Sequence, residues 1–100
     1  MRQELDVLVS ALCADYARRT ELIKHGGLSR RVETELRYLN AKITDATLEY
    51  CADEELDTFI YEIGGRIGYA NSALSDISET TYKHKKRDIK ENIARRLYLV

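Results

Sequence analysis

Apolar residues recur along most of this chain at steps of three and four positions, which is the spacing of one face of an α-helix. The first such stretch predicts a helix over about residues 2 to 24, and Gly26 and Gly27 follow it as a stop signal. A second stretch begins after Ser29, a good helix cap, and its apolar positions alternate steps of four and three up to Tyr50. Two and a half heptads are too few for an independent coiled coil, so we expect this helix to pack antiparallel on the first.

The second half of the chain contains three shorter helical patterns. Four acidic residues stand in the first turn of a helix predicted near residues 53 to 63, where the helix dipole favours negative charge. The glycine pair at 64 and 65 interrupts the apolar stripe and predicts a break before a short helix near residues 66 to 74. Ser78 is placed to cap a final helix of about residues 79 to 97.

These patterns predict a single all-α domain over residues 1–100. Residues 1–51 are expected to form a long antiparallel helical hairpin, and residues 53–100 a helix-turn-helix-like three-helix unit. The chain has no proline, so no position is barred from a helix for want of a backbone donor. Its content of 44% hydrophobic and 33% charged residues is typical of a folded domain rather than a disordered tail.

Cellular setting is indicated only by what the chain lacks. No run approaches the roughly 18 apolar residues of a membrane span, and Glu4 and Asp6 interrupt any signal-peptide pattern at the N-terminus. We therefore expect a cytoplasmic protein that does not enter a membrane. Cys13 and Cys51 have no CxxC spacing and are interpreted as reduced, buried small hydrophobes, although a disulfide between them stays open.

Charge is distributed very unevenly along the chain. Seven basic residues against two acidic ones lie between Lys83 and Arg96, a local net charge of +5, whereas residues 1–82 carry nine basic and fifteen acidic side chains. The total of −1 hides this asymmetry. A basic segment on an acidic body is typical of chains that bind nucleic acid or a membrane surface.

The predicted last helix has two distinct faces. At 100° per residue, Tyr82, Ile89 and Ile93 fall together with Leu97 on the side expected to be buried. Thr80, Lys83, His84 and Arg87 project away from that side. In a helix-turn-helix, the second helix offers residues near its N-terminus to base edges in the major groove.

The run Ile77-Ser-Glu-Thr-Thr-Tyr-Lys-His, followed by Ile89 and Ile93, resembles the recognition helix of sigma-factor region-four and LuxR-type helix-turn-helix domains. The C-terminal arrangement is also similar to small sigma-like transcriptional regulators of bacteriophages and mobile elements. The resemblance implies DNA-binding transcription control. It places the recognition surface on Glu79, Thr80, Lys83, His84 and Arg87. Lys86 stands beside the core where those families prefer leucine, and its alkyl stem would reach out to solvent.

DNA binding would divide the basic residues into two groups. Phosphate neutralisation is expected of one group, which comprises Lys85, Lys86, Lys90, Arg95 and Arg96. Base edges are expected to meet Thr80, Lys83, His84 and Arg87. The partners expected are double-stranded DNA and, as an extension, RNA polymerase. A homodimer is a hypothesis, with pairing through the heptad face of the second helix or through the tail from Leu97 to Val100.

Two alternatives remain beside DNA binding. The lysine-rich helix would be only a solvated face if the chain were an all-helical protein-protein interaction or structural module with no nucleic-acid binding. A second basic cluster surrounds the first hairpin turn, and binding to phosphate, to acids of RNA polymerase or to water alone all stay open; it comprises Arg18, Arg19, Lys24, His25, Arg30 and Arg31.

Nothing in the sequence favours an enzyme. Neither His25 nor His84 has a cysteine or carboxylate at a metal-ligand spacing that stands out, and the stretch Gly64–Gly68 lacks the spacing and the lysine of a nucleotide loop. We therefore expect no catalytic residue, no cofactor and no metal.

Overall fold

The computed structural model describes all 100 residues, Met1–Val100, and contains helices and no strand. The predicted all-α class is confirmed. The elements along the chain are α1 (Gln3–Ala14), α2 (Tyr16–His25), α3 (Arg30–Leu48), the 3₁₀ turn η1 (Asp53–Glu55), α4 (Leu56–Gly64), the 3₁₀ turn η2 (Tyr69–Asn71) and α5 (Glu79–Arg96).

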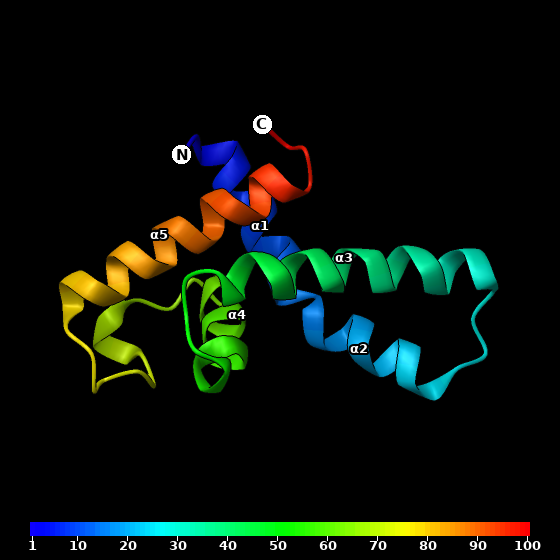
Figure 1. The fold of residues 1–100 in the computed structure, drawn as a ribbon, viewed down its shortest axis with the longest axis horizontal. Helices are drawn as coiled ribbons and strands as arrows, with labels where there is room; N and C mark the ends of the chain where they lie inside the picture. Colours follow the sequence, from blue (N-terminus) through cyan, green and yellow to red (C-terminus); the bar gives the residue numbers. More distant parts are fainter.

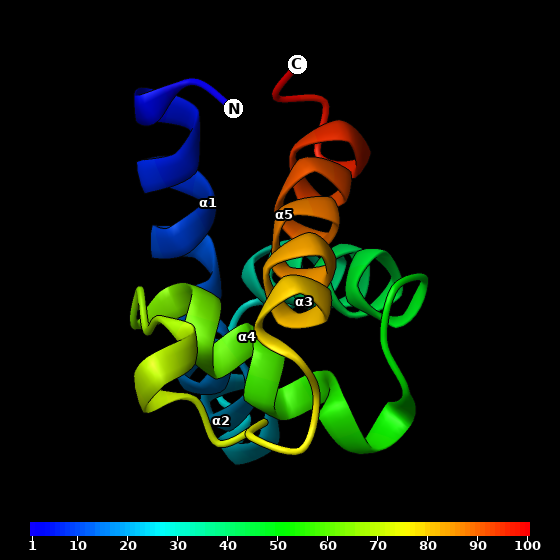
Figure 2. The same ribbon diagram turned by 90° about the vertical axis from the view of Figure 1, so that its left-hand side faces the viewer.

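The helices form a body and a projecting arm, which together measure 43 × 27 × 20 Å (Figure 1). In the body, α1 and α5 run antiparallel side by side, so that both chain termini lie at the same end (Figure 2). α4 packs on α1, and the helix α3 contacts both α4 and α5. The arm is made by α2 and the N-terminal half of α3, which run antiparallel (Figure 1).

The single helix predicted over residues 2 to 24 is wrong, because the chain bends at Asp15 and divides it into α1 and α2. The bend is supported by Arg19, whose guanidinium donates to the carbonyl oxygen of Leu12 at 2.6 Å. A side-chain donor thus binds a carbonyl beside the bend. As a result, α1 packs into the body while α2 pairs with α3 in the arm.

The turn and cap predicted for the arm are both present. Gly26 and Gly27 have φ of 73° and 80°, a left-handed region that other residues avoid, and they connect α2 to α3. The Ser29 hydroxyl oxygen accepts from the backbone N–H of Val32 at 3.3 Å, which caps α3. The same arrangement recurs at α5, where Ser78 accepts from the N–H of Thr81 at 3.1 Å.

The helix predicted near residues 53 to 63 is present as η1 followed by α4. Its acidic start is a structural cap, since the Glu55 carboxylate accepts from the backbone N–H of Ala52 at 3.0 Å. The short helix predicted near residues 66 to 74 is wrong, and only the single turn η2 lies there. Arg66 adopts a left-handed φ of 54°, and the N–H of Ile67 bonds back to the Glu62 carbonyl at 2.9 Å, which ends α4.

The core lies where α1, α3, α4 and α5 meet. Phe59 and Tyr82 stack at its centre with ring centroids 5.7 Å apart. The eleven residues that compose it are Val9, Cys13, Ile43, Ala46, Phe59, Ile60, Ile63, Tyr82, Ile89, Ile93 and Ala94. Both cysteines are unpaired, and Cys51 is only half-buried.

Gly64 was predicted from the sequence only to break a helix, but in the structure it also allows α4 to pack closely on α1. It is the last residue of α4, and it touches the backbone of α1 so closely that a Cβ there would stand 2.5 Å from the nitrogen of Ala14. Because a backbone atom cannot move aside as a flexible side chain does, the two helices can approach this closely only at a glycine.

The variant Gly64→Ala should therefore lower the free energy of unfolding by about 1–3 kcal/mol, because the added methyl forces α4 away from α1. Gly68→Ala is the matched control, since no atom lies within 4 Å of its added Cβ. Urea denaturation followed by circular dichroism measures both. Equal stability of the two variants would contradict this packing.

Candidate nucleic-acid interface

The inward and outward faces predicted for α5 are present. Tyr82, Ile89 and Ile93 are at most 1% exposed and pack into the core. On the opposite side, Thr80, Lys83, His84 and Arg87 are exposed together with Glu79. No other element covers this side of the N-terminal half of α5, which we call the open face and define by Glu79, Thr80, Lys83, His84 and Arg87.

The charges of the open face are held only by short-range contacts. Lys83 pairs with Glu79 one turn earlier at 3.3 Å, and Arg87 lies 3.5 Å from the neighbouring Asp88. Exposed pairs of this kind contribute about 0.2–1 kcal/mol and are weakened by salt. Both cations therefore remain available to an anion that approaches from solvent.

Four of the five residues predicted to bind phosphate have partners inside the fold. Lys85 pairs with Glu55 at 3.1 Å. Lys90 donates to Asp6 at 2.9 Å, and Arg96 pairs with Glu49. These contacts tie α5 to η1, α1 and α3 in turn.

The pKa of each of the three acids is lowered by its hydrogen bonds. The hydrogen bond from Lys90 holds the pKa of Asp6 below its usual value, and the hydrogen bond from Arg96 does the same for the pKa of Glu49. The pKa of Glu55 is lowered first by the N–H of Ala52 and then by Lys85. These carboxylates are therefore ionised at neutral pH and compete with any phosphate for the same cations.

Lys86 is the fourth of these residues, and its surroundings differ from the predicted ones. Its ammonium donates to the carbonyl oxygen of Ile67 at 2.5 Å and lies 5.5 Å from the centre of the Tyr82 ring. Burial is the main cause that lowers the pKa of this lysine. Lys86 thus lies beside the core as predicted, but its ammonium bonds to the loop after α4 instead of reaching out to solvent.

Arg95 differs from the other four predicted phosphate ligands, because it has neither an acidic partner nor a hydrogen bond to another element. It is exposed and donates to the side-chain oxygen of Asn92 at 3.2 Å, one turn earlier on α5. The freely presented cations of α5 are therefore Lys83, Arg87 and Arg95, rather than all seven that its sequence offers.

Glu62 is a structural residue of this region that the sequence did not reveal. Its carboxylate is 2% exposed and accepts from the Ser72 hydroxyl at 2.7 Å, the Ala73 N–H at 2.7 Å and the Tyr82 hydroxyl at 2.8 Å. The contacts join α4, the loop before α5 and α5 itself. The only signal in the sequence is an acid placed directly between apolar positions of the α4 stripe.

The charge state of Glu62 follows from these contacts. Burial alone would raise its pKa, but the hydrogen bonds from Ser72, Ala73 and Tyr82 lower it below the usual value. Burial and the neighbouring carboxylate raise the pKa of Tyr82 to about 12, so the tyrosine stays protonated and donates. The loop from Ser72 to Ser78 is thereby fixed against α4, which sets where α5 begins.

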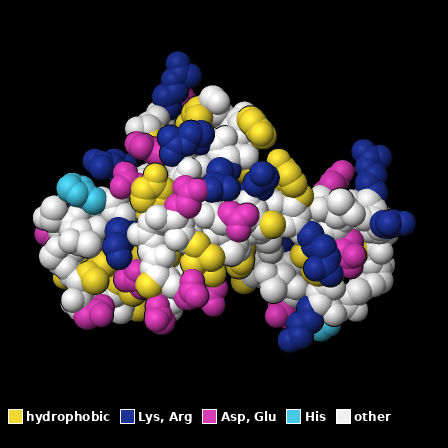
Figure 3. Space-filling model, viewed as in Figure 1, with side chains coloured by type: hydrophobic (Ala, Val, Ile, Leu, Met, Phe, Trp, Pro, Cys, Tyr) yellow, Lys and Arg dark blue, Asp and Glu magenta, His cyan; other side chains and the backbone are white.

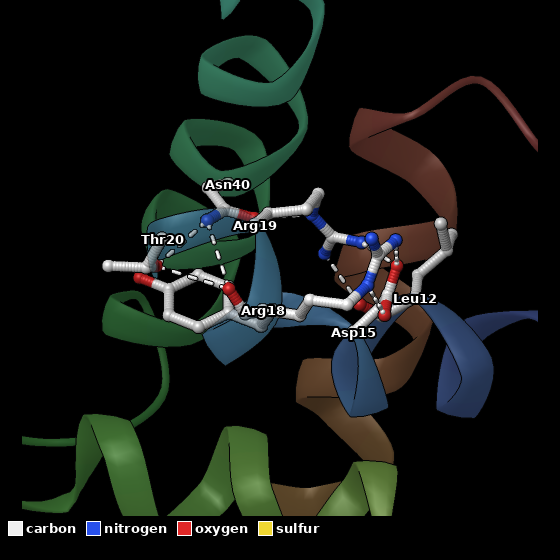
Figure 4. Close-up of polar contacts among 7 residues, drawn as sticks. Leu12, Asp15, Arg18, Arg19, Thr20 and Asn40 are labelled. Atoms are coloured by element: carbon white, nitrogen blue, oxygen red, sulfur yellow. Dashed lines mark hydrogen bonds and ion pairs between the residues drawn. The ribbon is translucent and has the colours of Figure 1, made fainter. Parts of the chain in front are cut away.

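The basic cluster at the arm is mostly a structural network, shown in Figure 4. Arg19 is 3% exposed and donates to the Asn40 side-chain oxygen at 2.6 Å, while Asn40 in turn donates to Thr20 at 3.0 Å. Arg18 binds Asp15 with both its nitrogens, at 2.6 and 2.5 Å. The network joins α2 to α3 and leaves Lys24, Arg30 and Arg31 as exposed cations near the tip of the arm.

Neither a search for metal ligands and membrane-spanning helices nor a comparison with known proteins points to another site. No three His, Cys, Asp or Glu side chains come close enough together to hold a metal ion, and no helix has both the length and the apolar character needed to cross a membrane. Comparisons of this chain with known protein families, with curated proteins and with solved structures find no match.

The residues that carried the helix-turn-helix resemblance divide into two groups. Ser78 caps α5, and Tyr82 and Ile89 are buried, as a recognition helix requires. Before α5, however, residues 65–78 contain only the turn η2, so no helix precedes it across a short turn. Any recognition through α5 would therefore involve one anchored helix rather than a packed helix pair.

The variant Glu62→Gln should lose about 2 kcal/mol of unfolding free energy at neutral pH, because its amide is neutral and has one acceptor oxygen in place of two, so that at least one of the three donors loses its acceptor. A carboxylate whose pKa is lowered on folding stabilises the protein above its unfolded pKa of about 4.3, and that contribution disappears as the pH falls through the folded-state value. The difference between wild type and variant should therefore narrow in acid. Denaturation at a series of pH values, with Glu54→Gln as the exposed control, measures it. A gap independent of pH would contradict the role of the charge.

Proposed function

We propose that this chain is a cytoplasmic DNA-binding protein of transcription control that presents the open face of α5 to the major groove. The observation that carries the proposal is the exposure of Thr80, Lys83, His84 and Arg87 on one side of a helix whose other side is fixed in the core. An α-helix fits the major groove of B-DNA, and its exposed polar side chains can reach base edges there.

The four side chains suit base readout in different ways. Arg87 can donate two parallel hydrogen bonds to a guanine, which discriminates by about 1–3 kcal/mol against other bases. The Lys83 ammonium donates, His84 can donate or accept through its ring nitrogens, and Thr80 can donate or accept. Glu79 is an acceptor that suits a cytosine amino group and opposes a nearby phosphate, so it would contribute specificity rather than affinity.

Affinity would be lower than the basic composition of α5 suggests. On random-sequence DNA, which offers no specific base contacts, the phosphate contacts would come from Lys83, Arg87 and Arg95, since Lys85, Lys86, Lys90 and Arg96 hold the fold together. Each phosphate neutralised adds about −0.9 to the slope of log affinity against log salt concentration. Three contacts therefore correspond to a slope of about −3, whereas seven would give about −6.

The salt dependence of binding to random-sequence duplex DNA tests the proposal. Wild type should bind at about 50 mM salt with a slope near −3, and Lys83→Glu/Arg87→Glu should bind at least about tenfold more weakly with a slope reduced by about 2. Fluorescence anisotropy of a labelled duplex measures both quantities.

Arg30→Glu/Arg31→Glu is the matched control, because it makes the same change of charge on exposed residues of the arm. It should leave the slope near the wild-type value. The proposal fails if wild type does not bind at low salt, or if the control loses as much affinity as the α5 variant.

Protein binding is the second candidate, and one feature favours it. A groove of about 480 Å³ lies between α2 and α4, with Tyr16, Ala17, Ile60 and Gly64 among the residues that line it. Grooves between helices of this size commonly receive apolar side chains of a ligand or partner. If the folded wild-type protein does not bind DNA in this assay, the result would favour a function in protein binding.

A further inference from the structure

The end of the molecule that carries both termini has an unusual amount of exposed apolar surface. Side chains of Met1, Leu8, Tyr98 and Val100 are 48%, 43%, 82% and 77% exposed there. Figure 3 shows hydrophobic side chains lying among Lys and Arg side chains at the top of the molecule, where Figure 1 places the two termini. We call this surface the apolar end and define it by Met1, Leu5, Leu8, Tyr98, Leu99 and Val100.

The apolar end combines two surface hollows with apolar side chains that project into solvent. One hollow of about 520 Å³ is lined by Leu5, Leu8, Leu99 and Val100 with two charged residues. A second, of about 260 Å³, lies on the other side of Leu5 and Val100, next to Ala94. A surface with projecting side chains beside hollows of matching character can bind a copy of itself, as a two-fold interface requires.

Tyr98 gives independent evidence that this end has a partner. Beyond α5, the N–H of Leu99 bonds to the Ala94 carbonyl at 2.8 Å and the N–H of Tyr98 to the Arg95 carbonyl at 3.1 Å. In this helix ending the residue at the position of Tyr98 is usually glycine, and Tyr98 has a left-handed φ of 58°. A non-glycine residue is disfavoured there, because its Cβ comes too close to the following carbonyl oxygen.

The two backbone hydrogen bonds and the packing of Leu99 against the core hold this conformation, but the Tyr98 side chain itself contributes nothing to it within the chain. Arg66 has the same left-handed conformation at the end of α4, but its guanidinium pairs with Asp6 at 3.2 Å. The Tyr98 side chain, by contrast, is the most exposed large hydrophobic side chain of the molecule and forms no hydrogen bond within it. A strained backbone that displays an unused aromatic side chain is explained by a contact outside the single chain.

The charges around the apolar end point to a second copy as the partner. Arg2 and Glu4 border one hollow, and Glu91 and Arg95 border the other. None of the four forms an ion pair within 4 Å, although eleven such pairs occur elsewhere in the chain. Arg2, Glu4 and Glu91 suit a two-fold axis, which brings the base of each copy near an acid of the other and does not require Arg95, the base assigned above to DNA.

The other surface predicted for pairing, the heptad face of α3, is already used inside the chain. Ile43 and Ala46 are fully buried in the core. Further along α3, Thr44 hydrogen-bonds to Tyr16 at 2.7 Å and Asn40 binds Arg19. The C-terminal half of the face is therefore covered by the body, whereas Val32 at its start remains 41% exposed.

We propose that the chain forms a two-fold dimer through the apolar end, with Tyr98 and Val100 of each copy seated in the hollows of the other. The dimer does not rest on DNA binding. In it the C-terminal ends of the two α5 helices lie near the axis. Each open face begins at the far end of a helix of 18 residues, about 27 Å in length, and points away from the contact.

Sedimentation equilibrium of the full chain without DNA tests the dimer. Wild type should approach twice the 11.5 kDa of one chain as its concentration rises. Tyr98→Gly should weaken dimerisation at least about tenfold while leaving the single chain equally or more stable, because glycine removes the strain together with the aromatic contact. A merely structural tyrosine would not separate these two readouts.

A matched pair of charged variants locates the interface. Leu8→Lys and Val32→Lys replace apolar side chains that are 43% and 41% exposed, on the apolar end and on the arm respectively. Leu8→Lys should weaken the dimer at least about tenfold, and Val32→Lys should leave it unchanged. The proposal is overturned if wild type stays a monomer up to about 1 mM, if Tyr98→Gly dimerises like wild type, or if only Val32→Lys disrupts the dimer.

Discussion

The buried carboxylate of Glu62 determines how α5 sits on the rest of the molecule. It receives hydrogen bonds from the loop at Ser72 and Ala73 and from Tyr82 in the first turn of α5. An ionised group at this depth is tolerated only because its oxygens are satisfied, and removing one partner would leave a buried charge unsatisfied. The rotation of α5, and with it the choice of residues that face solvent, follows from this contact and from the burial of Ile89 and Ile93.

The basic residues that make the end of the sequence so different in charge from the rest fall into two groups in the structure: some pair with acids inside the fold, and others stay exposed. The excess of acid before Lys83 and the excess of base after it meet across the fold, where Asp6, Glu49 and Glu55 pair with residues of α5. Pairing of this kind attaches the last helix to three others. Only the open face and Arg95 keep their polar side chains free of distant partners, and this restricts the proposed DNA contact to a smaller surface than the sequence suggests.

Features that depend on neighbouring residues could be predicted from the sequence. Features that depend on contacts between distant residues could not. The caps at Ser29 and Ser78, the glycine turn and the apolar side of α5 follow from neighbouring residues alone. The bend at Asp15 depends on Arg19 reaching both Leu12 and Asn40 in another helix. The missing helix after α4 likewise depends on Glu62 binding the N–H of Ala73. The partners of Lys85, Lys90 and Arg96 lie 30, 84 and 47 positions away, distances that no periodic pattern reveals.

Nuclear magnetic resonance during titration with a short duplex tests the central claim most directly, because it reports every backbone amide at once. The account predicts that signals between Glu79 and Arg87 and near Arg95 shift with added DNA. It also predicts that those of Lys90, Asp6 and Glu55 stay in place, since their ion pairs persist in the complex. Shifts centred on the arm, a loss of the Lys90 and Asp6 contact on binding, or no shift at low salt would each contradict the account.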